Sequence, residues 1–522
     1  MQPVRKIERY GVFEESFSGT GDYANAYAEV EATVVFSRPD GGTWTIPLFW
    51  DGGKTWKARI SPDAVGVWRY AVRSSDAALD GVAGSFDCVP SSLHGSIVPM
   101  ERYPLHFQYQ DGTPFWFFGD TGWRSFADDV EKNLNRETVL HYFDVRASQG
   151  FNYIHIALTG SAGSFFEDEQ NVMYEYDYAN ERLNPEFFQE ADYRLTYMNA
   201  KGMTAGLLLP WATEWDRFAS DEAGLRFARY VVAGYSAYNV VFIIAGEWDT
   251  LGTDKDKKAR FQAIGHEMMR HDPHNRMRAI SAFRVVEEFA TQPWMSFGDY
   301  QQLYRAPHGR EATAAERDSL RNYLLMPKVH GRPVVNSEYA YYLREMGDDH
   351  SYHKVPIKGV DKPHSHTRAS FRRASWVLAM AGGYFVTGFG TTFYGGWRDL
   401  GPFDVNAPKN DVAEEDLMHI REFFTSLKWW KLQVMDSLVK AKEGFCYCLV
   451  ELGRTYVVYG EGCTAIELNP DGDPSATYAV RRFDPRTGIY MELPDYAGSG
   501  PIELSVPDAQ DCVFLVTARP VL

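Results

Sequence analysis

The chain has 522 residues, of which 45% are hydrophobic and 24% charged, so it is long enough for two to four globular domains. Its 53 basic and 70 acidic residues give a formal charge of −17, and no run of Lys or Arg offsets this charge. The acidic balance argues against nucleic acid or anionic membranes as partners. No stretch of about 18 apolar residues could span a membrane, and the first residues form no apolar signal segment. Both absences favour a cytoplasmic protein.

The five cysteines are too few and too irregularly spaced to predict a disulfide framework. They are Cys88, Cys446, Cys448, Cys463 and Cys512. Ligation of a metal would require further ligands at suitable spacings, so we expect buried thiols. The sequence therefore predicts neither a metal nor a cofactor.

The first 92 residues have the pattern of an all-β domain. Alternating or apolar segments at 27–36, 43–50, 55–60 and 65–72 are separated by turns such as Pro39–Gly42. Short strands with frequent turn signals predict a β-sandwich. This domain could bind sugar or brace its neighbour, and we favour bracing because sheet surfaces are often used in interdomain packing.

Between residues 93 and 432 strands and helices alternate. Strands are predicted at 115–120, 151–158, 203–211, 240–246, 278–283, 294–300, 333–338 and 384–388. Helices are predicted at 135–149, 185–201, 221–238, 260–270, 317–329 and 367–381. Several strands are continuous apolar runs, as in parallel sheets buried on both faces. The pattern predicts an α/β fold, a (β/α)8 TIM barrel with long loops.

From residue 433 to residue 522 the chain is again β-rich. Short strands at 445–452, 455–460, 465–468, 478–488 and 511–517 alternate with glycines and turns. We expect a C-terminal β-sandwich, so the chain has three domains at 1–92, 93–432 and 433–522.

Two glutamates stand where barrel enzymes place their chemistry. Glu247 directly follows the strand VVFIIAG, and Glu338 is the last residue of PVVNSE, the seventh predicted strand. The carboxyl ends of barrel strands meet at one mouth, so the two carboxylates would face each other across it. Glycoside hydrolysis needs such a pair, one to protonate the leaving oxygen and one to attack the anomeric carbon or activate water. A single glutamate at a strand end could equally be an ion-pair partner, but two at these strands favour catalysis.

Other side chains at the predicted strand ends could bind the substrate. We expect roles in stacking or hydrogen bonding for Asp120, Trp123, Trp211, Trp248, Tyr300, Gln301 and Trp397. Burial beside Trp248 would favour the protonated form of Glu247, and Tyr300 could hydrogen-bond the nucleophile. For Asp120 a buried helix-capping role, and for Trp211 core packing, are the alternatives.

Two other classes of function stay open. The loop after Glu338 contains His350, His353, His364 and His366, whose spacing could serve a metal-dependent hydrolase. We favour solvated loop histidines, because no cysteine or helical HExxH motif accompanies them. A non-catalytic carbohydrate-binding or scaffold protein would leave both glutamates without a function in catalysis.

The chain resembles the apiosidase-like family of glycoside hydrolases over nearly its whole length. The resemblance is carried by 115–123 (FWFFGDTGW), by Gly246 and Glu247, by Glu338, and by 65–70 (VGVWRY) in the N-terminal sandwich. The segment 483–488 (FDPRTG) is similar to the C-terminal sandwich that such proteins carry and that is labelled collagen-binding.

The resemblance implies a retaining clan A mechanism with Glu247 as acid/base and Glu338 as nucleophile. Enzymes of clan A usually carry Asn before the acid/base residue, where it binds the sugar 2-hydroxyl, and here that position is Gly246. Apiosidase-like members often have Asp in place of Glu247. We expect an exo-glycosidase acting on short plant- or microbe-derived oligosaccharides, and the sequence leaves a homo-oligomer open.

Overall fold

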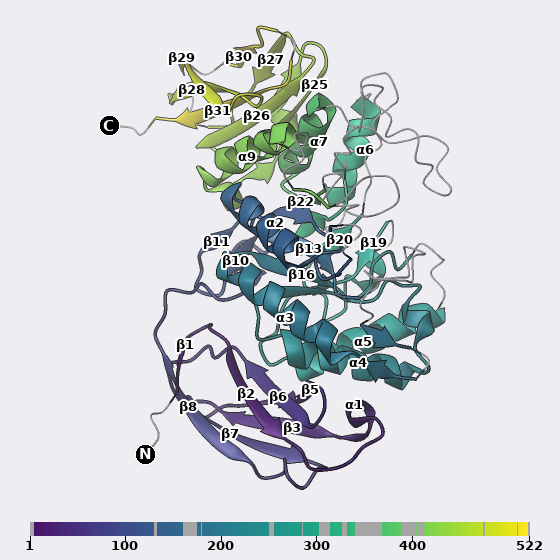
Figure 1. Cartoon of the computed structure of the whole chain (residues 1–522). Coiled ribbons are helices and arrows are strands. Elements are labelled where there is room, and N and C mark those ends of the chain that lie inside the picture. The colour runs from purple at the N-terminus through teal and green to yellow at the C-terminus, as the bar shows by residue number, and fades with distance from the viewer. Residues whose placement is uncertain are drawn as a thin grey trace.

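The structure is a computed structural model of the chain. It describes residues 5–129, 133–159, 175–178, 180–249, 255–283, 286–301, 314–325, 331–339, 368–388, 403–405, 411–472, 475–498, 500–508 and 510–519. Figure 1 shows three successive parts, with an N-terminal β part at the bottom, an α/β part in the middle and a C-terminal β part at the top. None of the described helices combines the length and the apolar character that crossing a membrane requires.

The N-terminal part contains two sheets around one core. One sheet has the order β1 (Lys6–Glu8), β8 (Ala83–Val89), β7 (Gly66–Ser74), β3 (Ala32–Ser37), β4 (Thr43–Pro47). The other has the order β2 (Phe13–Ser18), β6 (Thr55–Ile60), β5 (Phe49–Trp50). The rings of Phe13 in β2 and Phe86 in β8 stack at 4.1 Å, so the apolar faces of the two sheets share one core.

One predicted strand of this part is wrong in its first half. Residues 27–36 were expected to be a single strand, but a short helix α1 (Ala26–Glu29) precedes β3. The side chain of Glu29 accepts a hydrogen bond from the backbone N–H of Asn25, which closes this turn. Tyr27 is buried edge-on against Tyr176 and Tyr230 of the central part, a contact that local sequence does not reveal.

The central part is built on a parallel sheet of nine short strands. Their spatial order is β18 (Arg278–Ala279), β17 (Val240–Ile243), β16 (Thr204–Leu208), β13 (Tyr153–Ala157), β12 (Phe118–Thr121), β22 (Tyr384–Thr387), β21 (Val334–Asn336), β20 (Gly298–Tyr300), β19 (Ser281–Ala282). The two outer strands, β18 and β19, are separated along the chain by Ile280 alone, so the sheet is nearly closed. The structure differs from the predicted eight strands at two places. The predicted fifth strand is divided into β18 and β19, which pair with β17 and β20. The predicted first strand, 115–120, is also divided, because β11 (Pro114–Phe115) pairs with β10 (Phe107–Tyr109) in a separate three-stranded sheet with β9 (Ile97–Pro99), and only β12 joins the parallel sheet.

Helices surround this sheet. They are α2 (Arg136–Ser148), α3 (Pro185–Ala200), α4 (Asp221–Tyr235), α5 (Lys255–His271), α6 (Ala314–Leu325), α7 (Arg368–Met380) and α9 (Asp411–Thr425). The predicted helices are confirmed within a few residues at most ends, although α5 begins earlier than expected and α9 was missed. The capping residue that marked the start of one predicted helix has this role in the structure. The Asn135 side chain caps α2 by accepting a hydrogen bond from the backbone N–H of Thr138.

The C-terminal part again has two sheets around a core. The larger has the order β23 (Gln433–Val434), β25 (Phe445–Glu451), β26 (Thr455–Glu461), β31 (Cys512–Ala518), β28 (Thr477–Asp484), β29 (Ile489–Ala497). The smaller has the order β24 (Val439–Ala441), β27 (Ala465–Leu468), β30 (Ile502–Ser505). All five cysteines of the chain are free thiols, and four of them are buried.

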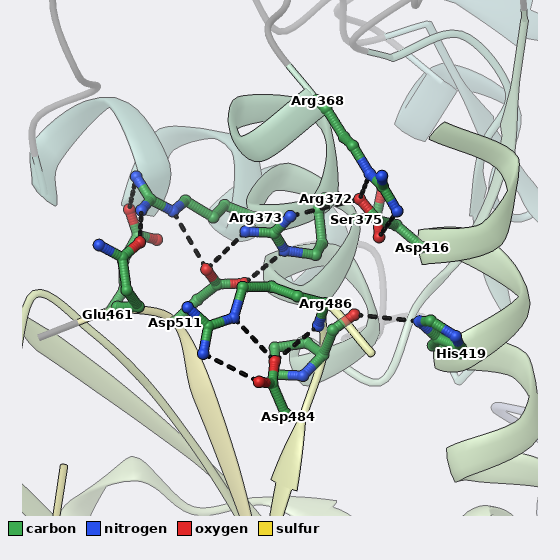
Figure 2. A network of polar contacts seen from close by, with 12 residues as sticks. Arg368, Arg372, Arg373, Ser375, Asp416, His419, Glu461, Asp484, Arg486 and Asp511 are labelled. Atoms are coloured by element: carbon green, nitrogen blue, oxygen red, sulfur yellow. Dashed lines mark hydrogen bonds and ion pairs between the residues drawn. The ribbon is translucent and has the colours of Figure 1, made fainter. Parts of the chain in front are cut away.

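Buried ion pairs join the β parts to the barrel helices. Arg59 of β6 pairs with Asp192 of α3 at 2.6 Å and has a nearly buried side chain. At the other end, Figure 2 shows Arg372 of α7 between Asp511 and Asp416, with Nε–Oδ2 2.7 Å to Asp511. Because unpaired buried charges are costly, these contacts fix both β parts on the central sheet.

Candidate active site

Glu247, which follows β17 after Ile244, Ala245 and Gly246, has an unusual backbone conformation. Its φ is +52°, in the left-handed region that few residues other than glycine adopt. The neighbouring peptides are hydrogen-bonded, because Ala212 N–H donates to the Gly246 carbonyl and Trp248 N–H donates to the Ser281 carbonyl. Strained residues of this kind persist where the surroundings fix them, and they cluster at functional sites.

Glu338 lies just beyond β21 and is held by a strong hydrogen bond. The amide Nε2 of Gln301 donates to Oε1 of Glu338 at 2.6 Å, and both side chains are nearly fully buried. The backbone supports this position, since the N–H of Ser337 donates to the carbonyl of Tyr300 at 2.7 Å. An amide donor favours the charged form of a carboxylate, which is the form that a nucleophile needs.

An aromatic row lies beside Glu247. The rings of His155 and Trp123 are 4.6 Å apart, and those of Trp123 and Trp211 are 5.5 Å apart. Trp211 forms a parallel bridge with Gly246 and lies directly over its Cα, since a Cβ added at Gly246 would be 2.3 Å from a ring carbon of Trp211. The ring of Trp211 therefore fills the position in which a side chain at residue 246 would lie.

Adding one methyl group to Gly246 tests this contact. We expect Gly246→Ala to lower the free energy of unfolding by about 1–3 kcal/mol, because the Trp211 ring must move. A backbone shift at residue 246 would also displace the neighbouring Glu247. We expect this displacement to lower kcat by roughly 10- to 100-fold. Chemical denaturation and steady-state kinetics would measure both effects.

Gly234→Ala is the matched control, because a Cβ there meets no atom within 4 Å and should leave activity unchanged. The double variant Gly246→Ala/Trp211→Leu should recover part of the lost stability, since the two residues are in contact. Equal effects at both glycines would contradict the steric explanation.

The other predicted site residues have different positions. Asp120 is fully buried and accepts hydrogen bonds from Tyr142 at 2.9 Å and Arg146 at 2.5 Å, both on α2. Its second oxygen accepts the Thr121 N–H at 2.9 Å, so both carboxylate oxygens are engaged by protein donors. These contacts favour the structural alternative for Asp120 over the predicted contact with a sugar.

Two further predicted residues are fully buried, and one is not described. The ring of Trp248 packs edge-on against Phe289, with the ring centroids 4.7 Å apart. Tyr300 is fully buried, and its neighbour Gln301 makes the hydrogen bond to Glu338. Trp397 and the four histidines of the loop after Glu338 lie outside the described residues. Among the residues that are described, no group of three or more acidic, His or Cys side chains could hold a metal.

Two residues near the mouth were missed by the sequence analysis. His155 is the one polar side chain within the apolar strand β13, a pattern that could have marked it. Glu214 follows the bridge residue Trp211, and its carboxylate accepts the Trp211 N–H at 3.1 Å. Burial raises the pKa of Glu214 to about 7, with a further increase from the nearby Glu175.

The raised pKa of Glu214 predicts a pH-dependent stability. The folded protein binds this proton more tightly than the unfolded chain, so stability is lost as pH rises from about 4.5 through about 7. Glu214→Gln keeps an acceptor for Trp211 without the charge. We expect it to match the wild type near pH 5 and to exceed it by roughly 2 kcal/mol near pH 8. Denaturation at both pH values measures the difference, and an equal difference at both would contradict the assignment.

The parallel sheet carries Glu247 and Glu338 just beyond β17 and β21. The residues of this sheet lie within 102–431, which match the family model described as "Apiosidase-like, catalytic domain". The fold and this match define a glycoside hydrolase. The match covers more than half of the chain, which therefore belongs to the apiosidase-like family. Residues 6–75 match a domain of unknown function, DUF5060.

Solved structures share the fold at low sequence identity. A proposed glycoside hydrolase from Bacteroides vulgatus ATCC 8482 is similar with a TM-score of 0.75 and 18% identity, covering 99% of this chain and 100% of that one. A family 5 glycoside hydrolase from the same organism has a TM-score of 0.65 and 14% identity, covering 81% of this chain and 93% of that one. No curated protein matches the chain in a sequence comparison.

Proposed function

We propose that the protein is a retaining exo-glycosidase with Glu247 as acid/base and Glu338 as nucleophile. The observation that carries this proposal is the hydrogen bond from Gln301 to Glu338, which prepares one carboxylate as a nucleophile near the strand ends that also hold Glu247. The left-handed backbone of Glu247 is consistent with a residue held in place for chemistry.

The reaction would proceed in two displacements. The carboxylate of Glu338 attacks the anomeric carbon while the glycosidic C–O bond breaks, and the carboxyl group of Glu247 gives its proton to the leaving oxygen. In the second step Glu247 accepts a proton from water, whose oxygen attacks the same carbon and releases Glu338. Two inversions give net retention of the anomeric configuration.

We extend the proposal to the strand count of the barrel, the domain boundaries and the substrate. We count β18 and β19 as one strand of an eight-stranded barrel, flanked by β-sandwiches, with domains at 1–92, 93–432 and 433–522. Trp123 and Trp211 would stack on the sugar, and the substrates would be short plant- or microbe-derived oligosaccharides met in the cytoplasm. Exo action is supported by the aromatic row beside Glu247, which would close one side of the site.

A panel of nitrophenyl glycosides tests the proposal. The panel should include β-galactoside, β-glucuronide, arabinofuranoside and apioside, and each should be assayed with and without a metal chelator. We expect hydrolysis of at least one glycoside irrespective of chelation. Proton NMR of the first product should show the anomer of the substrate. A first product of the opposite configuration would rule out retention. If no glycoside were hydrolysed, the proposed exo-glycosidase activity would be contradicted.

A further inference from the structure

A pocket lies at the edge of the parallel sheet opposite Glu247 and Glu338. Trp116 lines it two residues before β12, and Asn152 lines it directly before β13. Glu247 and Glu338 instead follow the strands β17 and β21. Because the strands are parallel, their beginnings and ends lie at opposite edges of the sheet, roughly 10–15 Å apart for strands of this length. This basal pocket is therefore separate from the candidate active site.

The walls of the basal pocket are mainly aromatic. Its volume is about 480 Å³, and its aromatic lining residues are Tyr109, Phe115, Trp116, Trp429 and Trp430. The partly buried ring of Trp430 packs edge-on against Trp429, with the ring centroids 4.7 Å apart. The partly buried ring of Tyr109 packs in the same way against Phe115 at 5.1 Å. Rings that keep part of their surface accessible can stack on a flat group of a ligand.

Arg421 in α9 supplies a positive charge to the basal pocket and is partly buried. Its guanidinium makes no hydrogen bond or ion pair within the part of the chain that the structure describes, although acidic residues outnumber basic ones by 70 to 53. None of the described residues that line the pocket is acidic. The guanidinium lies beside the end of α2, since a Cβ added at Gly150 would be 2.8 Å from its Nη1, so stabilising this helix end is the structural alternative to binding an anion.

The other polar groups of the pocket are mostly hydrogen-bond donors. Trp116 is 5% exposed, and within the described structure its Nε1 has no hydrogen-bond partner. The amide of Asn152 is already used at both ends, because its Oδ1 accepts from the Phe118 N–H and its Nδ2 donates to the Trp116 carbonyl. Burial raises the pKa of Tyr109 to about 12, so its hydroxyl keeps its proton near neutral pH. Such a set of donors matches a carboxylate, whose oxygens only accept.

The rings and the donors together select the kind of ligand. A sugar presents hydroxyl groups that both donate and accept, and the pocket offers few free acceptors for them. A small inorganic anion would pair with Arg421 but would leave the aromatic walls without a partner. A flat ring that carries a carboxylate satisfies both features, since the ring can stack and the planar guanidinium can bind both carboxylate oxygens.

We propose that the basal pocket is a binding site for a small aromatic carboxylate, with the carboxylate on Arg421 and the ring against Trp430. The site goes beyond the proposed glycosidase activity, because it uses neither Glu247 nor Glu338. Its ligand binds at the far edge of the sheet and does not compete for the mouth at which the two glutamates lie.

Calorimetric titration of the full chain with small probes tests this site. Benzoate and 4-hydroxycinnamate are the aromatic carboxylates. Benzyl alcohol lacks the charge, whereas acetate, inorganic phosphate and glucuronate lack the aromatic ring. We expect at least one aromatic carboxylate to bind roughly tenfold or more tightly than each of the other four probes.

Two variants locate the binding. Arg421→Gln removes the charge and Trp430→Leu removes a ring face, and each should raise the Kd for the aromatic carboxylate roughly tenfold or more. Arg481→Gln in β28 is the matched control, because its guanidinium also lies near an aromatic ring, 4.9 Å from the centroid of Tyr490, but outside the pocket. This control should leave the Kd unchanged. Trp430→Leu alters a partly exposed side chain and keeps the test valid if Arg421→Gln fails to fold.

Three outcomes would overturn the site: no aromatic carboxylate bound by the wild type, another probe bound as tightly as the aromatic carboxylates, or a Kd unchanged in both variants. A lower melting temperature of Arg421→Gln with an unchanged Kd would assign Arg421 to the end of α2 alone. Glycoside hydrolysis tests the proposed function separately, because both variants keep Glu247 and Glu338 and should keep the wild-type kcat.

Discussion

Glu338→Ala is expected to lower kcat by on the order of 10⁴-fold with little loss of stability. The reason is that the variant lacks the carboxylate that Gln301 holds in place and that would form the covalent intermediate. Azide should restore turnover, because the alanine leaves room for a small anion at the anomeric carbon. The product of this single displacement is a glycosyl azide whose anomeric configuration is inverted relative to the substrate, which proton NMR identifies.

Glu247→Ala should respond differently to the same treatment. Dinitrophenyl glycosides have good leaving groups that need little protonation, so their first step should be nearly normal while unactivated substrates react slowly. Azide would then attack the glycosyl enzyme and give a product of retained configuration. The exposed Glu137→Ala on α2 is the control and should keep full activity. The same azide anomer from both variants would contradict the two assigned roles.

Asp120→Ala is expected to lower the free energy of unfolding by about 3–5 kcal/mol. Asp120 and Glu414 both pair with Arg146, and all three side chains are almost completely buried. Burial acts against the charge of Arg146, but its two acidic partners outweigh this effect and raise the pKa of the guanidinium. Removing Asp120 would leave part of this charge unpaired, which urea denaturation measures directly.

The kinetic result separates this structural role from a role in binding. Folded Asp120→Ala protein should keep a KM within about twofold of the wild type, because both carboxylate oxygens are engaged by Tyr142, Arg146 and Thr121. Asp120→Asn offers a milder change if the alanine variant is insoluble. The matched control is Asp495→Ala, which breaks an exposed ion pair with Arg519 and should change stability by less than about 1 kcal/mol. A large increase in KM without loss of stability would contradict the structural role and support a contact between Asp120 and the substrate.

The local signals in the sequence were sufficient for most elements of the fold. Continuous apolar runs marked the parallel strands, and caps such as Asn135 marked helix ends, because both depend on neighbours within a few residues. The helix at Tyr27 was missed because its packing partners, Tyr176 and Tyr230, lie far away along the chain. The division of the fifth strand was missed for a similar reason, since pairing partners are chosen in space.

For the site, the residue types at the strand ends, including Glu247 and Glu338, could be predicted from the amino-acid order. It could not determine where their neighbours point, because a strand buried on both faces has no alternation of polar and apolar residues that shows its direction. Three contacts became visible in the folded structure alone. Asp120 accepts a hydrogen bond from Arg146 on α2, Gln301 donates one to Glu338, and the Trp211 ring lies over Gly246. Strand register and helix packing decided these contacts, because they act between residues that are distant along the chain.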